Sequence, residues 1–223
     1  TNFFGLSSNE GRGRSEHDRC KTLRDSNSGQ SGPVFFFAKQ IIERVGSLFP
    51  EVYFPVFSYD GYKFPPKDFV APKGLMINVA VGGDYSKAIT ESGHERTRRQ
   101  FESWAELKVP LFVFSYTSKM YFSQLPWPIF RNTLRNIQYY HDMGVIGFLG
   151  QVSGRNWGPN GLHYYMVSKA LWNPDLDVEA VFEDYCEKGF GPAAEDVKGY
   201  YGTYWNAVKT KNVPIKRSPD AGG

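Results

Sequence analysis

Several features that would narrow the function of this chain are scarce or missing. Cysteine occurs only at Cys20 and Cys186, which lie far apart in the sequence, so cysteine usage does not fix a redox compartment. Neither sign of charge dominates, because 26 basic and 23 acidic residues are mixed along the chain and leave a net charge of +3. That balance gives no indication of a nucleic-acid partner. No apolar run approaches the roughly 20 residues that a membrane-spanning helix needs, so we expect no membrane partner.

Common cofactor motifs are also missing. The glycines at 82–83 and 11–13 are not followed by Lys-Ser/Thr in phosphate-loop register, and neither group opens a helix as a dinucleotide-binding turn would. No G-x-S-x-G nucleophile turn is present. His17 and Cys20 have a ligand-like spacing, but two ligands without a second pair make a poor zinc site. We therefore expect no cofactor and no metal.

Hydrophobic and aromatic residues are plentiful. With 223 residues, of which 41% are hydrophobic, the chain is long enough to bury a substantial core. Aromatic residues make up 17% of it. Rings that stack on sugars or bases in a cleft and rings that simply fill a core are equally good explanations of this content.

Short apolar strands alternate with amphipathic helices, which predicts an α/β fold. The expected strands are Phe3–Leu6, Val52–Ser58, Leu75–Val81, Leu111–Ser115 and Val145–Leu149. The expected helices are Val34–Leu48, His94–Leu107, Ile129–His141, Gly161–Trp172, Val178–Lys188 and Ala193–Val208, with Asp177 as the N-cap of the fifth. Several strands are continuous apolar runs, as expected in a parallel sheet buried on both faces.

Five strand–helix units fit two architectures. One is an open five-stranded sheet; the other is the last five units of a (β/α)8 barrel, whose usual length is about 250 residues. The absence of an initiator Met and the immediate start of the first strand favour the partial barrel, followed by extra C-terminal helices. We expect one partial catalytic domain over residues 1–208 and a polar tail or linker over 209–223.

Polar side chains follow the carboxyl ends of the expected strands, where chemistry sits in both architectures. Three are carboxylates and three are tyrosines, and the full set is Asn9, Glu10, Tyr59, Asp60, Asp84, Tyr85, Ser115, Tyr116 and Gln151. Glycoside hydrolysis needs one carboxylic acid to protonate the leaving oxygen and one carboxylate as base or nucleophile. A strand-end carboxylate is individually more often a helix cap or a solvated charge, but three on one expected rim favour a site.

The loop after the first expected strand, from Ser7 to Pro33, is unusually long, since loops beyond about 15 residues are often functional or disordered. Arg12 and Arg14 beside Glu10 could bind an anionic substrate group through paired hydrogen bonds, although a solvated charged loop explains each arginine as well. Trp157 could reach the same rim or could pack under the final helices.

The C-terminal third, GPNGLHYYMVSKALWNPDLDVEAVFEDYCEKGFGPAAEDVKGYY from Gly158 to Tyr201, resembles a bacterial family known as domain of unknown function DUF4838. The stretches SSNEGRG, DRCKTL and FFFAKQIIERVGSLFPEVYFPVFSY extend the resemblance over nearly the whole chain. Such proteins look like relatives of α-glucuronidases and other barrel glycosidases. The resemblance implies that the five strands are the fourth to eighth of a barrel, that its N-terminal part is a partner from the same protein or a second fragment, and that the protein is periplasmic or extracellular.

The resemblance also implies roles for particular residues. Glu10 would be the general acid, Asp84 the base in an inverting reaction, and Asp60 the reserve base. The substrate, an anionic carbohydrate polymer or oligosaccharide, would be held by Asn9, Arg12, Arg14, Tyr59, Tyr62, Tyr116, Trp127, Gln151 and Trp157. Two positions that are often acidic in such proteins are neutral here, at Ser115-Tyr116-Thr117 and at Gly150-Gln151. A non-catalytic carbohydrate-binding protein on a glycosidase scaffold is therefore the alternative.

Overall fold

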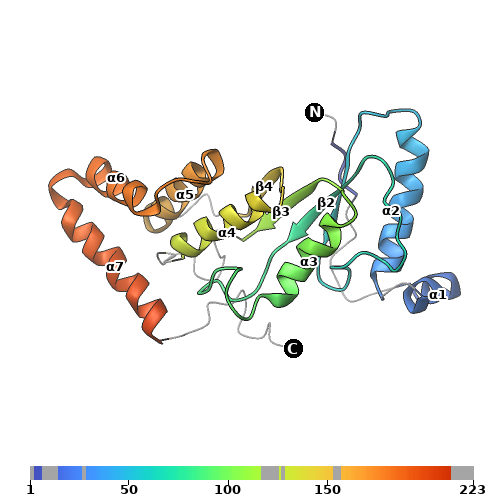
Figure 1. The fold of residues 1–223 in the computed structure, drawn as a ribbon, viewed down its shortest axis with the longest axis horizontal. Helices are drawn as coiled ribbons and strands as arrows, with labels where there is room; N and C mark the ends of the chain where they lie inside the picture. The colour runs from blue at the N-terminus through green and yellow to red at the C-terminus, as the bar shows by residue number, and fades with distance from the viewer. Residues whose placement is uncertain are drawn as a thin grey trace. The chain divides into compact units, whose positions relative to one another are not determined.

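The computed structural model describes residues 3–6, 15–26, 29–116, 126, 129–152 and 157–211 (Figure 1). Its elements follow in the order α1 (Asp18–Ser26), α2 (Ser31–Gly46), β1 (Phe54–Ser58), β2 (Leu75–Ala80), α3 (Glu95–Ala105), β3 (Leu111–Ser115), α4 (Phe130–Asp142), β4 (Gly147–Gly150), α5 (Trp157–Trp172), α6 (Val178–Phe190), a 3-10 turn (Gly191–Ala193) and α7 (Ala194–Lys211). The predicted α/β class is confirmed.

The strands form one sheet in the order β1-β2-β3-β4. β1 and β2 pair in parallel, with Phe54 opposite Leu75 and Ser58 opposite Val79. β2 and β3 are also parallel, with Ile77 opposite Leu111. Every residue of β2 is buried, as expected for a central parallel strand whose residues are apolar except for Asn78.

The first expected strand, Phe3–Leu6, is present as an isolated parallel bridge between Phe3 and Tyr53. Two further hydrogen bonds run from the N–H of Phe4 to the carbonyl of Tyr53 and from the N–H of Leu6 to the carbonyl of Pro55, at 3.0 and 2.9 Å. The ladder would continue with a bond donated by residue 55, but proline has no N–H. The fifth strand–helix unit therefore stays a prediction.

The chain divides into two compact units, each of which we describe by itself. The first contains residues 1–81, 98–114 and 145–147, and hence α1, α2, β1, β2 and most of α3 and β3. The second contains residues 82–97, 115–144 and 148–223, and hence α4 to α7. The expected boundary at residue 208 is not tested by this division, although α7 continues past it to Lys211.

A buried polar network joins α3 to β1 in the first unit. The Gln100 amide donates to the carbonyl and the hydroxyl of Ser58, at 2.9 and 2.7 Å. The Trp104 indole N–H lies 3.0 Å from the Ser58 hydroxyl and 2.8 Å from the Lys63 carbonyl. Ser58 itself donates to Lys63, so the polar atoms at the centre of this network are hydrogen-bonded. Trp104, 0% exposed, also packs on Phe35 of α2, with ring centroids 4.6 Å apart.

β4 approaches β3 closely enough to require a glycine. The N–H of Ile146 donates to the carbonyl of Leu111 at 2.9 Å, just before β4 begins. A Cβ atom at Gly147 would overlap the ring of Phe112. A side chain at residue 147 would therefore require the Phe112 ring to move.

In the second unit, the helices α4 to α7 enclose an apolar core. It contains Phe130 and Leu134 of α4, Leu162 and Met166 of α5, and Phe182 of α6, among others. Phe130 and Phe182 stack with centroids 5.5 Å apart. The predicted N-cap of α6 is confirmed, because the Asp177 carboxylate accepts hydrogen bonds from the N–H groups of Glu179 and Ala180 at 2.9 and 3.1 Å.

Arg131 links α4 to α6 at the border of this core. Its Nε and Nη2 donate to the two carboxylate oxygens of Glu179, both at 2.6 Å. The guanidinium also lies over the rings of Phe130, Phe182 and Trp205. This hydrogen bonding by Arg131 lowers the pKa of Glu179 below its ordinary value.

Two segments differ from the sequence prediction. The long loop from Ser7 to Pro33 contains the helix α1 and the first turn of α2. α5 begins at Trp157, four residues before the expected start at Gly161, so Trp157 lies on a helix and not in a loop. Pro159 is tolerated because it lies in the first turn, where its missing N–H would have no helical partner.

Candidate functional site

In the first unit, a tight turn after β1 carries three of the predicted site residues. Tyr59 and Tyr62 form an antiparallel bridge, in which the N–H of Tyr62 donates to the carbonyl of Tyr59 at 2.9 Å. Their rings lie edge to face with centroids 6.5 Å apart. Between them Asp60 has a φ of 45°, a left-handed conformation that aspartate tolerates, and its side chain is exposed. Tyr62 is only 5% exposed, so little of its ring surface is free to stack on a sugar.

In the second unit, the segment after β2 holds Asp84 in a defined orientation. Its Oδ1 accepts hydrogen bonds from the N–H and the hydroxyl of Ser86, at 3.0 and 2.6 Å. His94 Nε2 lies 3.0 Å from the carbonyl of Asp84 and must donate to it, because a carbonyl can only accept. Gly83, with a φ of 127°, leaves room for the His94 ring, which a Cβ there would meet at 3.1 Å. The Asp84 backbone and carboxylate are thus both fixed.

The remaining described candidates in the second unit lie after β3 and β4. The N–H of Gln151 donates to the carbonyl of Ser115 at 2.8 Å, which brings the ends of these strands together. Tyr116 is buried. Trp157 is 68% exposed, and its ring lies 5.4 Å from that of Tyr164 on the same helix. Trp157 thus has an accessible ring face, as a stacking residue requires.

The other predicted site residues lie outside the described part of the chain. They are Asn9, Glu10, Arg12, Arg14 and Trp127. Among the residues that are described, no cluster of three or more His, Cys, Asp or Glu could hold a metal ion. The described helices also include none that is long and apolar enough to cross a membrane.

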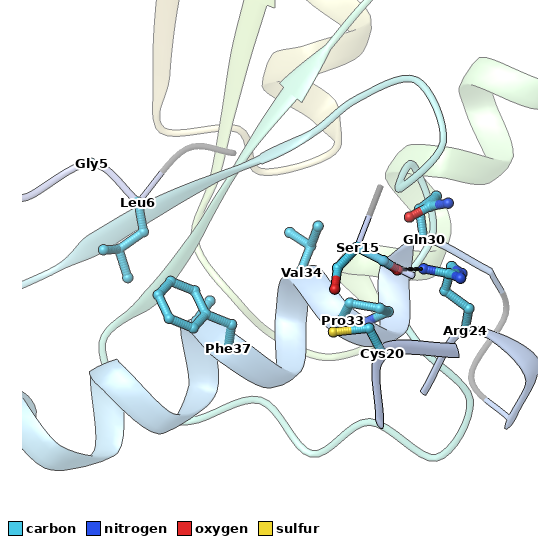
Figure 2. Close-up of a pocket in the computed structure, with 10 residues that line it drawn as sticks. Gly5, Leu6, Ser15, Cys20, Arg24, Gln30, Pro33, Val34 and Phe37 are labelled. Carbon is cyan, nitrogen blue, oxygen red and sulfur yellow. Dashed lines mark hydrogen bonds between the residues drawn. The ribbon is translucent and has the colours of Figure 1, made fainter. Parts of the chain in front are cut away.

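A cavity of about 390 Å³ lies in the first unit between the segment 3–6, α1 and α2 (Figure 2). Leu6, Val34 and Phe37 give it an apolar side, and Ser15, Arg24 and Gln30 give it a polar one. Arg24 Nη1 donates to the carbonyl of Ser15 at 2.6 Å. The thiol of Cys20 also lines this cavity.

The family model described as "Domain of unknown function (DUF4838)" matches residues 1–202. The chain belongs to this family. Comparison with curated proteins and with solved structures gave no match. Membership of the DUF4838 family confirms the resemblance seen in the sequence, whereas the likeness to α-glucuronidases stays a prediction.

The DUF4838 match covers the first unit, with its cavity, and most of the second, yet sequence reasoning did not find the cavity. Cys20 was considered only as a poor metal ligand beside His17, and Arg24 and Phe37 were assigned to no site. The signal that could have found them is the i, i+4 spacing of Cys20 and Arg24, which places both on one face of α1.

Proposed function

We propose that this chain is the catalytic part of a glycoside hydrolase that acts on an anionic carbohydrate, such as a polymer or oligosaccharide containing uronic acid. The observation that supports the proposal is the parallel pairing of β1 and β2, whose carboxyl ends lie at one edge of the sheet. Asp60 follows β1 in the sequence, and Asp84 follows β2. Active sites of parallel α/β proteins lie at this end of the strands, and two carboxylic acids are the usual requirement for glycosidic bond cleavage.

Asp84 suits the role of base because its carboxylate is already oriented by Ser86. A base that activates water must hold one geometry, so that little reorganisation is needed during the reaction. Glu10 would be the general acid, and Asp60 the reserve base. Tyr59 and Trp157 would stack on sugar rings, and Arg12 and Arg14 would bind the substrate's anionic group.

The same proposal assigns the sheet to a (β/α)8 barrel, with the segment 3–6 and β1 to β4 as its fourth to eighth strands. The exposed Phe3 and Phe4 support it, since apolar side chains at a sheet edge call for a covering element. That element would be the N-terminal part of the barrel, from the same protein or a second fragment. A periplasmic or extracellular location also belongs to this proposal.

A carbohydrate-binding protein without catalysis is the second candidate. It is favoured by the neutral residues at the ends of β3 and β4, where Ser115 is buried and Gln151 is bonded to it through the backbone. A site that kept Tyr59 and Trp157 but lacked a competent base would bind sugars without cleaving them.

The test is reducing-sugar release by the full-length protein from a panel of uronic-acid-containing and neutral polysaccharides. We expect Glu10→Gln and Asp84→Asn each to reduce turnover about 100-fold or more, the range that a general acid or base contributes. Asp175→Asn, at an exposed carboxylate between α5 and α6, is the matched control and should leave turnover unchanged.

Each outcome decides between the candidates. Glycan binding without turnover in the unmodified protein would overturn catalysis and leave the binding protein. Turnover that survives Glu10→Gln would overturn the assigned acid. Absence of both turnover and glycan binding would overturn the carbohydrate proposal altogether.

A further inference from the structure

The cavity between the segment 3–6, α1 and α2 is lined by none of the described strand-end candidates, and its two sides differ in chemistry. Figure 2 shows Leu6 and Phe37 together on one side, with Arg24 and Gln30 on the other. Its volume of about 390 Å³ falls within the range of roughly 300 to 1,000 Å³ in which small-molecule sites lie. Mostly apolar walls with a few polar groups at one end are the usual composition of such sites.

The guanidinium of Arg24 indicates which charged group a ligand of this cavity would carry. Its side chain is only 16% exposed, and one guanidinium nitrogen donates to the Ser15 carbonyl. The carboxylate of Glu16 lies 3.9 Å from Nη2, which exceeds a hydrogen-bond distance, and the Glu16 side chain is 75% exposed. A guanidinium has five N–H donors, so Arg24 retains both charge and donors for a carboxylate.

The apolar side favours an alkyl or aryl group over a sugar as the ligand. One face of a pyranose could stack on Phe37, but hydroxyl groups directed at Leu6 and Val34 would lose their hydrogen bonds to water without replacement. An alkyl or aryl group would instead exclude water from these side chains, which is favourable.

We propose that this cavity binds a small amphipathic carboxylate, with its apolar body against Leu6, Val34 and Phe37 and its carboxylate on Arg24. The proposal does not depend on the glycosidase assignment, because it involves none of the strand-end carboxylates and predicts a ligand without sugar rings.

The test is calorimetric titration of the full-length protein with 4-phenylbutyrate, its uncharged amide and glucuronate. The carboxylate should bind at least fivefold more tightly than the amide, and glucuronate should not bind through this cavity. Arg24→Gln should weaken 4-phenylbutyrate binding about tenfold, a loss within the range for hydrogen bonds to charged groups, and leave amide binding unchanged. Arg44→Gln, at an exposed position in the last turn of α2, is the matched control.

The rate at which the two thiols are alkylated can show where the ligand binds. Cys186 is 0% exposed, whereas Cys20 lines the cavity, so a thiol-alkylating reagent should modify Cys20 first. Saturating 4-phenylbutyrate should slow this reaction at least fivefold, and Cys20→Ser should abolish it. Val34→Phe, which fills the apolar side and keeps Arg24, should abolish both binding and protection.

Several results would overturn the proposal. They are absence of 4-phenylbutyrate binding at millimolar concentration, equal binding of acid and amide, undiminished binding by a folded Arg24→Gln or Val34→Phe variant, and binding that leaves Cys20 unprotected. None of them bears on polysaccharide turnover, so failure here is distinguishable from failure of the glycosidase proposal.

Discussion

Two buried regions of the molecule differ in whether their polar side chains are hydrogen-bonded. Between β1 and α3, Ser58, Gln100 and Trp104 satisfy one another and the adjacent backbone. In α5, His163 is 2% exposed, and neither ring nitrogen has a hydrogen-bond partner in the structure as described. The first region is fixed by directional bonds, whereas the second depends on apolar packing that is strong enough to retain an unfavourable group.

The largest expected effect is the loss of stability when the hydrogen-bonded network of the first region is removed. Trp104→Ala should reduce the free energy of unfolding by about 3–5 kcal/mol, because it removes a fully buried ring and the donor to Ser58 and Lys63. Trp104→Phe, which keeps most of the packing, should cost less. Chemical denaturation measures both, with Trp172→Ala, at a 92% exposed position, as the control. A loss at residue 104 no larger than that at 172 would contradict the network's importance.

The next largest expected effect is a pH dependence of stability that is caused by the buried His163 in the second region. Burial lowers the pKa of His163 from 6.5 to about 3, so below pH 6.5 the unfolded state binds a proton that the folded state does not. The contribution of neutral His163 to the free energy of unfolding is therefore fully present above pH 6.5. The free energy of unfolding then falls by about 1.4 kcal/mol per pH unit as the pH drops towards 3.

His163→Leu should remove this dependence between pH 7 and 5 and raise stability at neutral pH by about 1–3 kcal/mol, because no polar atom stays unpaired. Denaturation curves at several pH values measure both effects. His141→Leu, at an exposed position in α4, should keep the slope. An unchanged slope in His163→Leu would show that other groups cause it.

The smallest expected effect is the loss of stability when the N-cap of α6, beside the second region, is removed. Asp177→Ala should destabilise the protein by about 1 kcal/mol, the usual value of an N-cap, because two N–H groups of α6 lose their acceptor. Chemical denaturation against Asp175→Ala, which removes a neighbouring exposed carboxylate, isolates the cap. Equal losses in the two variants would point to a general charge effect instead.

Elements with strong local signals were predictable from the sequence. The apolar runs predicted the bounds of β2 and β3 to within one residue. Asp177 was predicted as an N-cap because its position before an amphipathic stretch is typical of a cap. Such features depend on neighbouring residues alone.

Elements whose signals are weak or depend on distant residues were not predictable. α1 has no buried residue and therefore no apolar stripe to reveal it. The helix expected from Gly161 begins at Trp157, because the first turn of α5 accommodates both Gly158 and Pro159. The interrupted ladder at the segment 3–6 follows from Pro55, about fifty residues away in the sequence.

The candidate site was predictable only in outline. The expected strands placed Asp60 after β1 and Asp84 after β2 along the chain, and the parallel pairing of β1 with β2 is as expected. The hydrogen bonds that orient Asp84 involve Ser86 and His94, whose contacts arise from a turn that residue types alone did not specify. The burial of Tyr62 and Tyr116 depends on tertiary packing.

The close approach of Gly147 to Phe112 also limits how related sequences can vary. Any side chain at residue 147 needs the space that this aromatic ring occupies, so a larger residue there is compatible with the fold only when residue 112 becomes smaller. Across the DUF4838 family, we therefore expect these two positions, thirty-five residues apart in this chain, to change together.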